Sequence, residues 1–159
     1  MLISLCYEPA DSVLKIVLLK AANLPRLETT KLISKSRTRS FSIVAVHCSP
    51  VLDPYVKIYM FYKDQRIGKK RSTIRRTTQS PVYNECFTFA IPDNDLPNVY
   101  FDFVLLDYDR HRKHEPIGQV SIGNHQAETD QHWHDVCHRQ VAKQIAQWYQ
   151  LKPFNTHVT

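Results

Sequence analysis

Residues 53–61 read Asp53-Pro54-Tyr55-Val56-Lys57-Ile58-Tyr59-Met60-Phe61. From Pro54 onward the side chains alternate, with Val56, Ile58 and Met60 on one side and the intervening residues on the other. Successive side chains of a β-strand point to opposite faces of its sheet, so this alternation predicts a strand with two distinct faces. The stretch therefore favours a fold built on β-sheets.

Short apolar segments continue this pattern on both sides of the stretch, and clusters of turn-forming residues separate them. We expect strands over residues 2–7, 13–20, 54–61, 69–76, 99–105, 116–122 and 145–151, and a further strand after Pro81 that carries Phe87 and Phe89 on one face. Many short strands with turn signals between them are typical of a β-sandwich. The pattern predicts an all-β fold, an eight-stranded antiparallel sandwich.

A different period appears between residues 128 and 139. Trp133, Val136 and Cys137 recur at positions i, i+3 and i+4, which is the spacing of one face of a helix. Thr129 is a suitable N-cap residue, since its hydroxyl can accept a hydrogen bond from the first turn. We expect one short helix before the last strand.

Size and charge limit the classes of function. The chain has 159 residues, which is the size of one ordinary domain, and a formal net charge of +6. A positive charge of this size favours a polyanionic partner, either nucleic acid or a phospholipid surface. The basic residues gather in residues 31–39, 66–76 and 110–113, while carboxylates sit near turns.

Several classes of function lack their sequence signals. The three glycines, Gly68, Gly118 and Gly123, stand too far apart for a glycine-rich phosphate loop. No nucleophile or metalloprotease motif is present, so we expect no enzyme. No apolar run is long enough to cross a membrane, and no signal peptide opens the sequence. The four cysteines show no C-x-x-C spacing, which favours a reduced, cytoplasmic protein.

Residues 29–51 do not fit the strand pattern. They have no consistent period and begin with a basic run rich in serine and threonine, followed by an apolar piece at residues 41–46. A connection of this length inside a compact domain is uncommon. We interpret it as an inserted loop, with an extra β-hairpin arm as the alternative.

The ordered motifs of the chain resemble those of the synaptotagmin family, and they are most similar to the second, membrane-distal C2 domain of that family. The matching segments are residues 2–9, 14–24, 53–57, 80–85, 106–109 and 145–148. The resemblance implies a C2-like Greek-key sandwich over residues 1–153, with the insertion in the first calcium loop and a short tail at residues 154–159. In that family about half a dozen residues separate the first acidic ligand from the aspartate of Asp-Pro-Tyr, whereas Glu28 and Asp53 stand 25 positions apart.

The resemblance also implies a calcium site. Its ligands would be Glu28, Asp53, Asp107, Asp109 and Glu115, with glutamate at two positions where calcium-binding members usually show aspartate. Alternation along the strand that ends at Asp107 places Asp107 and Asp109 on one side of the following loop. Ca²⁺ prefers six to eight oxygen ligands, and a cup of carboxylates supplies them. Weak or lost calcium binding is the alternative.

The basic segment is the second candidate site, and it contains Arg66, Lys69, Lys70, Arg71, Arg75 and Arg76. In the resembling family this strand meets phosphoinositide headgroups and acidic partner proteins. Alternation places Lys69 and Arg71 on one side and Lys70 on the other. A solvated edge strand protected by charge is the alternative interpretation. No aromatic residue lies within residues 66–76 to stack on bases, so we expect no nucleic-acid binding.

These observations together predict a module that binds anionic phospholipids, phosphoinositides included, with Ca²⁺ as cofactor. The resemblance implies a role in vesicle trafficking and exocytosis, on the cytosolic face of a vesicle or of the plasma membrane. SNARE proteins, another C2 domain or a second copy of the chain are possible partners. The alternative is a calcium-independent C2 module that uses the basic strand alone. A zinc site formed by His132, His134, His138 and Cys137 is disfavoured, because Cys137 belongs to the apolar stripe of the helix.

Overall fold

The computed structural model describes residues 1–25, 52–110, 114–123, 130–138 and 143–154. Its eight strands are β1 (Leu2–Glu8), β2 (Val13–Lys20), β3 (Pro54–Tyr62), β4 (Gln65–Arg71), β5 (Val82–Ala90), β6 (Val99–Asp107), β7 (Glu115–Gly123) and β8 (Ile145–Trp148). One α-helix, α1 (Asp130–Cys137), precedes β8, and two short 3₁₀ turns, Pro92–Asn94 and Leu96–Asn98, precede β6. The predicted eight-stranded antiparallel sandwich with one late helix is confirmed.

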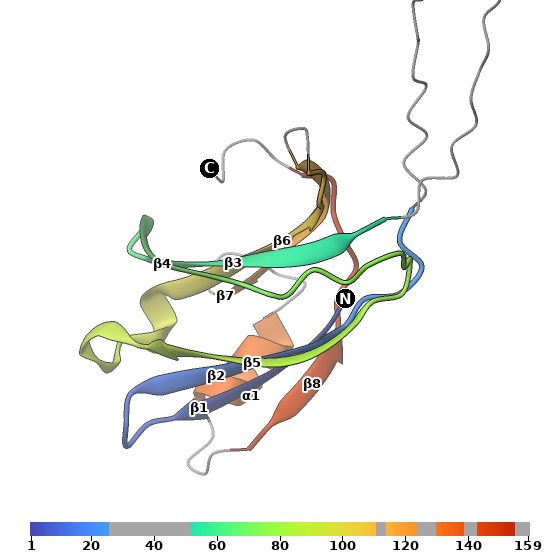
Figure 1. Ribbon diagram of the computed structural model, residues 1–159. Coiled ribbons are helices and arrows are strands. Elements are labelled where there is room, and N and C mark those ends of the chain that lie inside the picture. Colours follow the sequence, from blue (N-terminus) through green and yellow to red (C-terminus); the bar gives the residue numbers. More distant parts are fainter. Residues whose placement is uncertain (26–51, 111–113, 124–129, 139–142, 155–159) are drawn as a thin grey trace, which may run out of the picture.

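The strands form two sheets that lie one above the other (Figure 1). One sheet has the order β5-β2-β1-β8 and the other the order β4-β3-β6-β7, and the strand pairs are antiparallel. Hairpins supply part of this pairing, and a tight one joins β3 to β4 through Lys63 (φ 48°) and Asp64 (φ 63°). Two residues with positive φ form the type of turn that matches the twist of paired strands.

The core lies between the two sheets and follows the predicted alternation. Val56, Ile58 and Met60 are all at most 2% exposed and belong to the main core. The alternating residues of β6, Val99, Phe101, Phe103 and Leu105, are completely buried in the same core. Phe89 of β5 lies there too, with Phe87 packed against it, so the predicted common face of these two residues is confirmed.

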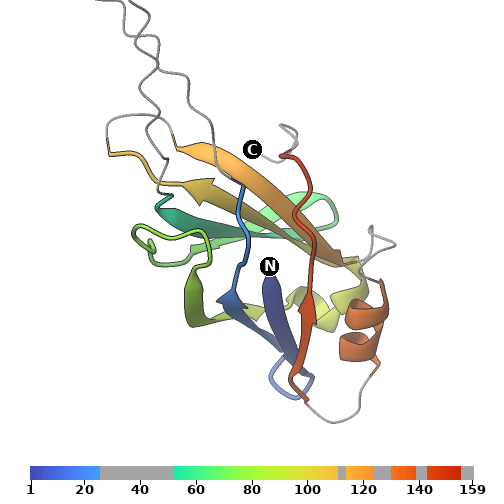
Figure 2. The same cartoon turned by 90° about the vertical axis from the view of Figure 1, so that its right-hand side faces the viewer.

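Helix α1 contacts β1, β7 and β8, and so it covers the side of the sandwich where the edges of the two sheets face each other (Figure 2). Trp133 and Val136 point from the helix into the main core, and Cys137 packs against it, as the apolar stripe predicts. The predicted N-cap, Thr129, lies outside the described residues.

Three predicted strand boundaries are wrong by three residues or more. Strand β4 begins at Gln65 and not at residue 69. Strand β4 ends at Arg71 and not at Arg76, because the buried Ser72 fixes the exit of the chain: its N–H donates to Val56 O (2.8 Å) and its Oγ accepts the N–H of Val56 (2.9 Å). Strand β8 ends at Trp148, after which Lys152 pairs with Gln119 of β7.

The inserted loop predicted at residues 29–51 and the apolar piece at residues 41–46 lie outside the described residues. No helix in the described ranges is long and apolar enough to cross a membrane.

Candidate functional site

A cluster of cations covers the outer face of β3 and β4. Lys57 pairs with Arg71 and Tyr59 with Lys69 in the register of these strands, so the side chains of these four residues share the face turned away from the core. Arg66 joins them, with its guanidinium 5.5 Å from the centre of the Tyr59 ring. We call Lys57, Arg66, Lys69 and Arg71 the outer basic face.

An aromatic floor lies beneath these cations. Tyr55, Tyr59 and Phe61 of β3 pack with Val104 and Leu106 of β6 in a second apolar cluster on the outer side of the sheet. The Lys69 Nζ lies 5.7 Å from the Tyr59 ring centre, and the Lys57 Nζ lies 5.9 Å from that of Tyr55. Each such cation–π contact contributes about 0.5–1 kcal/mol at an exposed position. The rings therefore hold the cationic groups in place on this face.

The positive charges of the outer basic face repel one another, as the pKa of Lys57 indicates. The pKa of Lys57 lies below its usual value, first because the side chain is partly buried and then because Lys69 and Arg71 are close. Like charges that converge on a partly desolvated group disfavour its charged form. An anion beside this face would relieve that repulsion, so the electrostatics of the outer basic face favour an anionic partner.

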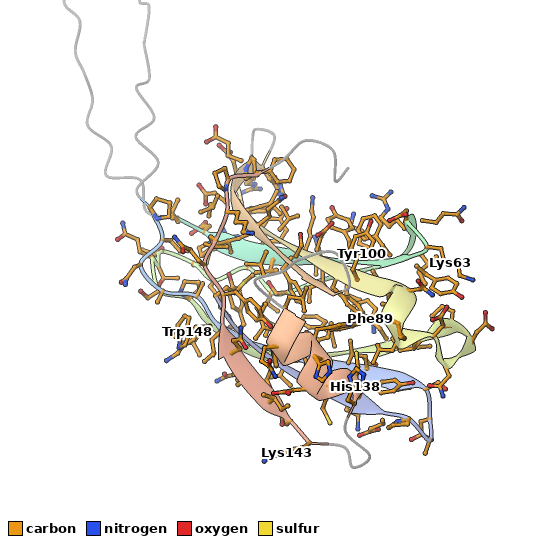
Figure 3. The ribbon with its side chains drawn as sticks, turned by 180° about the vertical axis from the view of Figure 1, so that it is seen from behind. Lys63, Phe89, Tyr100, His138, Lys143 and Trp148 are labelled. Carbon is orange, nitrogen blue, oxygen red and sulfur yellow. The ribbon has the colours of Figure 1, made fainter. Side chains whose placement is uncertain are left out.

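The six basic residues predicted as one segment lie in different places in the structure. Arg66, Lys69 and Arg71 lie on the outer basic face, whereas Lys70 points to the other side of β4, with its Nζ 5.2 Å from the ring centre of Phe89, a residue labelled in Figure 3. Arg75 and Arg76 follow the end of β4. The Nη2 of Arg75 donates to Tyr83 O at 2.7 Å and forms an ion pair with Glu85 at 3.3 Å.

Lys57 is the member of the outer basic face that was not predicted from the sequence. Its residue type within the Asp-Pro-Tyr-Val-Lys stretch gives no signal of its own, because a single lysine on a strand is common. The β3–β4 register supplies the signal, since it places Lys57 beside Arg71.

The predicted calcium ligands lie at the end of the sandwich where β3 begins, β6 ends and β7 begins. Pro54 pairs with Asp107, and Asp107 pairs with Glu115, so Asp53, Asp107 and Glu115 reach the same edge of the sheet. The N–H of Asp53 donates to Asp107 Oδ1 at 2.7 Å, and the N–H of Tyr108 donates to Asp53 O at 3.1 Å. Glu28 lies outside the described residues. We call Asp53, Asp107, Asp109 and Glu115 the acidic end.

Besides burial, the other carboxylates of the acidic end contribute to a raised pKa of Asp107. The pKa of Asp107 is raised, first by burial and further by the negative charges of Asp53, Glu115 and Asp109, while the hydrogen bond from the Asp53 N–H partly opposes the shift. Convergent carboxylates without a cation between them are expected to raise each other's pKa values. The structure therefore brings Asp53 and Asp107 into contact and holds Asp109 and Glu115 within electrostatic range.

Asp53 already has partners for both of its carboxylate oxygens. The Nη1 of Arg76 lies 2.6 Å from Oδ2, and the N–H of Thr77 donates to Oδ1 at 2.9 Å. Within the described ranges, no group of three or more His, Cys, Asp or Glu side chains is arranged to hold a metal ion. The described carboxylates thus do not fit a calcium site in the arrangement that the structure shows.

The histidines of α1 fall on different sides of the helix. His132 is 1% exposed, and its ring bonds to the Tyr149 hydroxyl and to Ile145 O. His134 and His138, the second of which is labelled in Figure 3, are exposed and stack at 3.9 Å between ring centroids. Cys137 is packed against the core, and burial raises the pKa of its thiol to about 12. A thiol with such a pKa is a poor metal ligand at neutral pH. The side chains considered for zinc are therefore not gathered around one point.

Comparisons with known proteins agree with this architecture. The family model described as C2 domain matches residues 12–151. Synaptotagmin-11 of Mus musculus is 32% identical over 154 residues, which are 96% of this chain and 31% of that protein. Synaptotagmin-4 of Homo sapiens is 33% identical over 152 residues, which are 95% of this chain and 31% of that protein. The chain thus spans about a third of the length of these curated relatives.

Solved structures show the same fold. The crystal structure of a C2 domain of RIM from Drosophila has a TM-score of 0.62 and 20% sequence identity, and the match covers 95% of both chains. The third C2 domain of the KIAA1228 protein has a TM-score of 0.60 and 17% identity, over 96% of this chain and 86% of that one. At this identity the likeness concerns the fold alone.

Proposed function

The chain belongs to the C2 domain family, and from this premise we propose that it is a module that binds anionic phospholipids, phosphoinositides included, through its outer basic face. The observation that carries the proposal is the convergence of Lys57, Lys69 and Arg71 on one face, where partial burial and then mutual repulsion lower the pKa of Lys57. Each Lys or Arg near an anionic leaflet contributes about 1 kcal/mol. Four such residues give about 4 kcal/mol, a factor of about 1,000 in affinity.

The burial of the aromatic floor favours a membrane over nucleic acid as the partner of this face. Single-stranded nucleic acids bind basic grooves by stacking their bases on aromatic rings. The rings of Tyr55 and Tyr59 lie directly below the cations, but only 2% and 5% of these residues are exposed. They support the cations and offer no open ring face to a base, so the face presents charge for phosphate groups at a surface.

Calcium dependence is the second candidate function. It is supported by the raised pKa of Asp107, which reflects burial first and then the negative charges of Asp53, Glu115 and Asp109 at the acidic end. With Glu28, these residues are the ligand set that the synaptotagmin-like motifs imply, and carboxylate oxygens are what Ca²⁺ prefers. The ion pair of Arg76 with Asp53 stands against this function in the arrangement described.

The cellular role follows from the relatives and is likewise a proposal. Similarity to synaptotagmins supports a non-catalytic part in vesicle trafficking and exocytosis, at the cytosolic face of a vesicle or plasma membrane. SNARE proteins, a further C2 domain or a second copy of the chain are the proposed protein partners. We also propose that residues 1–153 form one domain of the second-C2 type, with an inserted segment at residues 29–51.

Vesicle cosedimentation tests the proposed function. The chain is mixed with vesicles of neutral phosphatidylcholine, with vesicles that also contain phosphatidylserine, and with vesicles that contain a phosphoinositide in addition, each in EGTA and in calcium. We expect binding in EGTA that grows with the negative charge of the vesicle and weakens with salt. Equal binding to neutral vesicles would contradict the proposal, and binding in calcium alone would favour the second candidate.

A further inference from the structure

Strand β5 lies at the edge of its sheet, and no strand of the described residues pairs with its outer side. The edges formed by the other strands are protected: β4 is strongly basic, β7 pairs with Lys152, and β8 has only four residues. Charge, coverage and shortness are means by which proteins keep sheet edges from pairing with other chains. Residues 86–90 of β5 read Cys-Phe-Thr-Phe-Ala, with no charge and no proline. This stretch is therefore open to pairing.

The hydrogen bond that follows β5 shows which of its backbone groups face the open side. The N–H of Ile91 donates to Ser12 O at 2.7 Å and so continues the pairing of β5 with β2. Successive residues of a strand direct their N–H and C=O to opposite sides, so every second residue before Ile91 also bonds toward β2. The residues between them, Cys86, Thr88 and Ala90, direct these groups to the open side, and all three are exposed.

The regular part of this edge is short and is centred on Thr88. Asn84, with φ 52°, bends one end of β5, and Pro92 begins a 3₁₀ turn beyond the other end. An antiparallel copy of the strand, related by a two-fold axis at Thr88, would place Cys86 opposite Ala90 of the second copy and Thr88 opposite its own equivalent. Each pair of this kind exchanges two N–H···O=C bonds, so about six bonds would satisfy all of the outward-pointing groups.

The side chains of this stretch also suit pairing with an identical strand. On the exposed face, Cys86 would meet Ala90 and Thr88 would meet Thr88, so small uncharged groups would lie opposite each other. Like charges directly opposite each other are destabilising, and two β4 strands paired in the same way would bring lysines and arginines together. On the other face, Phe87 is only half-buried, and it would lie opposite Phe89 of the second copy as an aromatic cross-strand pair.

We propose that a second copy of this chain pairs with the β5 edge about a two-fold axis at Thr88, so that the two β5-β2-β1-β8 sheets join into one. This inference goes beyond the proposed lipid binding and does not depend on it. A two-fold axis perpendicular to the joined sheet leaves each face on its own side, so the β4-β3-β6-β7 sheets of both copies lie on the same side. The two outer basic faces then point the same way, and one membrane surface can meet both.

Amide hydrogen exchange measured by NMR without lipid tests the proposal. Salt at about 0.3 M screens the repulsion between two copies that each carry a formal charge of +6. The amides of Cys86, Thr88 and Ala90 should exchange about threefold more slowly, or slower still, at about 1 mM protein than at about 20 μM, because association follows mass action. The amides of Phe87 and Phe89, which bond to β2, are the internal control and should be protected equally at both concentrations.

Charge substitutions at the centre of the pairing give a second test, read by sedimentation velocity. Thr88→Lys places two like charges opposite each other, beside Lys15 of each copy, so this variant should remain monomeric at about 1 mM. Addition of an equal amount of Thr88→Glu should restore a dimer, because opposite charges then face each other. Ala146→Lys is the matched control: it adds the same charge at an exposed position of β8, the far edge of the same sheet, and should dimerise like the wild type.

Three results would overturn the proposal. The first is exchange of the outward-pointing amides at the same rate at both concentrations, which would mean that the chain does not pair with itself through β5. The second is dimerisation of Thr88→Lys to the same extent as the wild type, or loss of the dimer in Ala146→Lys as well. The third is failure of Thr88→Glu to restore the dimer while the control amides stay protected in both variants. If a variant does not fold, the concentration series of the wild type still decides.

Discussion

At the scale of single residues, His132 links α1 to the last strand through both ring nitrogens. Its Nε2 donates to Ile145 O at 3.0 Å, and Nδ1 bonds to the Tyr149 hydroxyl. In the neutral imidazole, which burial favours, Nδ1 accepts the hydrogen bond from that hydroxyl. Burial lowers the pKa of His132, and the bond to Ile145 O and the charge of Asp135 only partly oppose that shift.

A pH-dependent stability follows from this residue. The unfolded chain takes up a proton near the ordinary histidine pKa of 6.5, whereas the folded chain takes it up only at lower pH. The contribution of neutral His132 is therefore fully present above about pH 6.5 and decreases as the pH falls toward the folded pKa. We expect the unfolding temperature of the wild type to drop by a few degrees between about pH 7.5 and 5.5.

Two variants assign this drop to His132. His132→Gln should be less stable at neutral pH but should show a flatter dependence on pH, whereas His138→Gln, which changes an exposed histidine of the same helical region, should keep the wild-type slope. Differential scanning calorimetry at both pH values gives the comparison. An unchanged slope in His132→Gln would show that other groups cause the pH dependence.

Among single residues, the sequence pattern predicted the two faces of β4 but not the residue at which the strand ends. Alternation along β4 correctly placed Lys69 and Lys70 on opposite sides. It could not show that Ser72 would end the strand, because a buried hydroxyl that bonds across to Val56 looks like any exposed serine in the sequence. Arg75 and Arg76 were therefore grouped with the basic strand, although their partners are carboxylates.

At the scale of elements, the strands could be predicted because each one has a buried and an exposed side, as the alternation in β3 and β6 illustrates. The pairing of strands was harder to predict, since it depends on contacts between distant segments. The neighbours of β3 are β4, the next strand in the chain, and β6, which follows only after β5 has joined the other sheet. Lys57 joined the candidate site only through the pairing of β3 with β4.

The ends of the segment between β2 and β3 are anchored beside each other. The N–H of Leu24 donates to Gln79 O at 3.0 Å, and the N–H of Thr78 donates to Leu52 O at 2.9 Å. Leu24 and Leu52 are both buried, with exposures of 4% and 0%. Because residues 78 and 79 are adjacent, a short connection can join these two anchors.

We therefore expect that deletion of residues 30–49 leaves the fold intact. A shorter loop loses less entropy on closure, by about 1 kcal/mol for this change in length, so the unfolding temperature should stay the same or rise slightly. Thermal unfolding followed by circular dichroism measures this. Loss of the cooperative transition would mean that the deleted residues form part of the sandwich, and a variant with a glycine-serine linker of equal length would separate lost contacts from a strained junction.

At the scale of the whole molecule, the charges that sum to +6 are unevenly distributed, with one basic surface and one acidic surface. The outer basic face lies along β3 and β4, and the acidic end lies where β6 meets β3 and β7. The formal charge alone predicts a polyanionic partner but not where it binds. The surface is defined by the two-sheet architecture, which places Lys57 beside Arg71 and turns Lys70 to the other side.

We propose that the position of the basic charges, and not their sum, determines membrane binding. Two triple variants separate these possibilities. Lys57→Gln, Lys69→Gln and Arg71→Gln remove three charges from the outer basic face. Lys20→Gln, Lys70→Gln and Lys143→Gln remove three charges from exposed positions outside it.

Cosedimentation of both variants with phosphoinositide-containing vesicles in EGTA is the most direct measurement. We expect the outer-face variant to lose about a hundredfold in affinity, at about 1 kcal/mol for each lysine or arginine, and to lose most of its salt dependence. The matched variant should lose far less, about threefold at most, because its charges lie away from the bound leaflet. Equal losses in the two variants would show that only net charge matters, and unchanged binding of the outer-face variant would contradict the account.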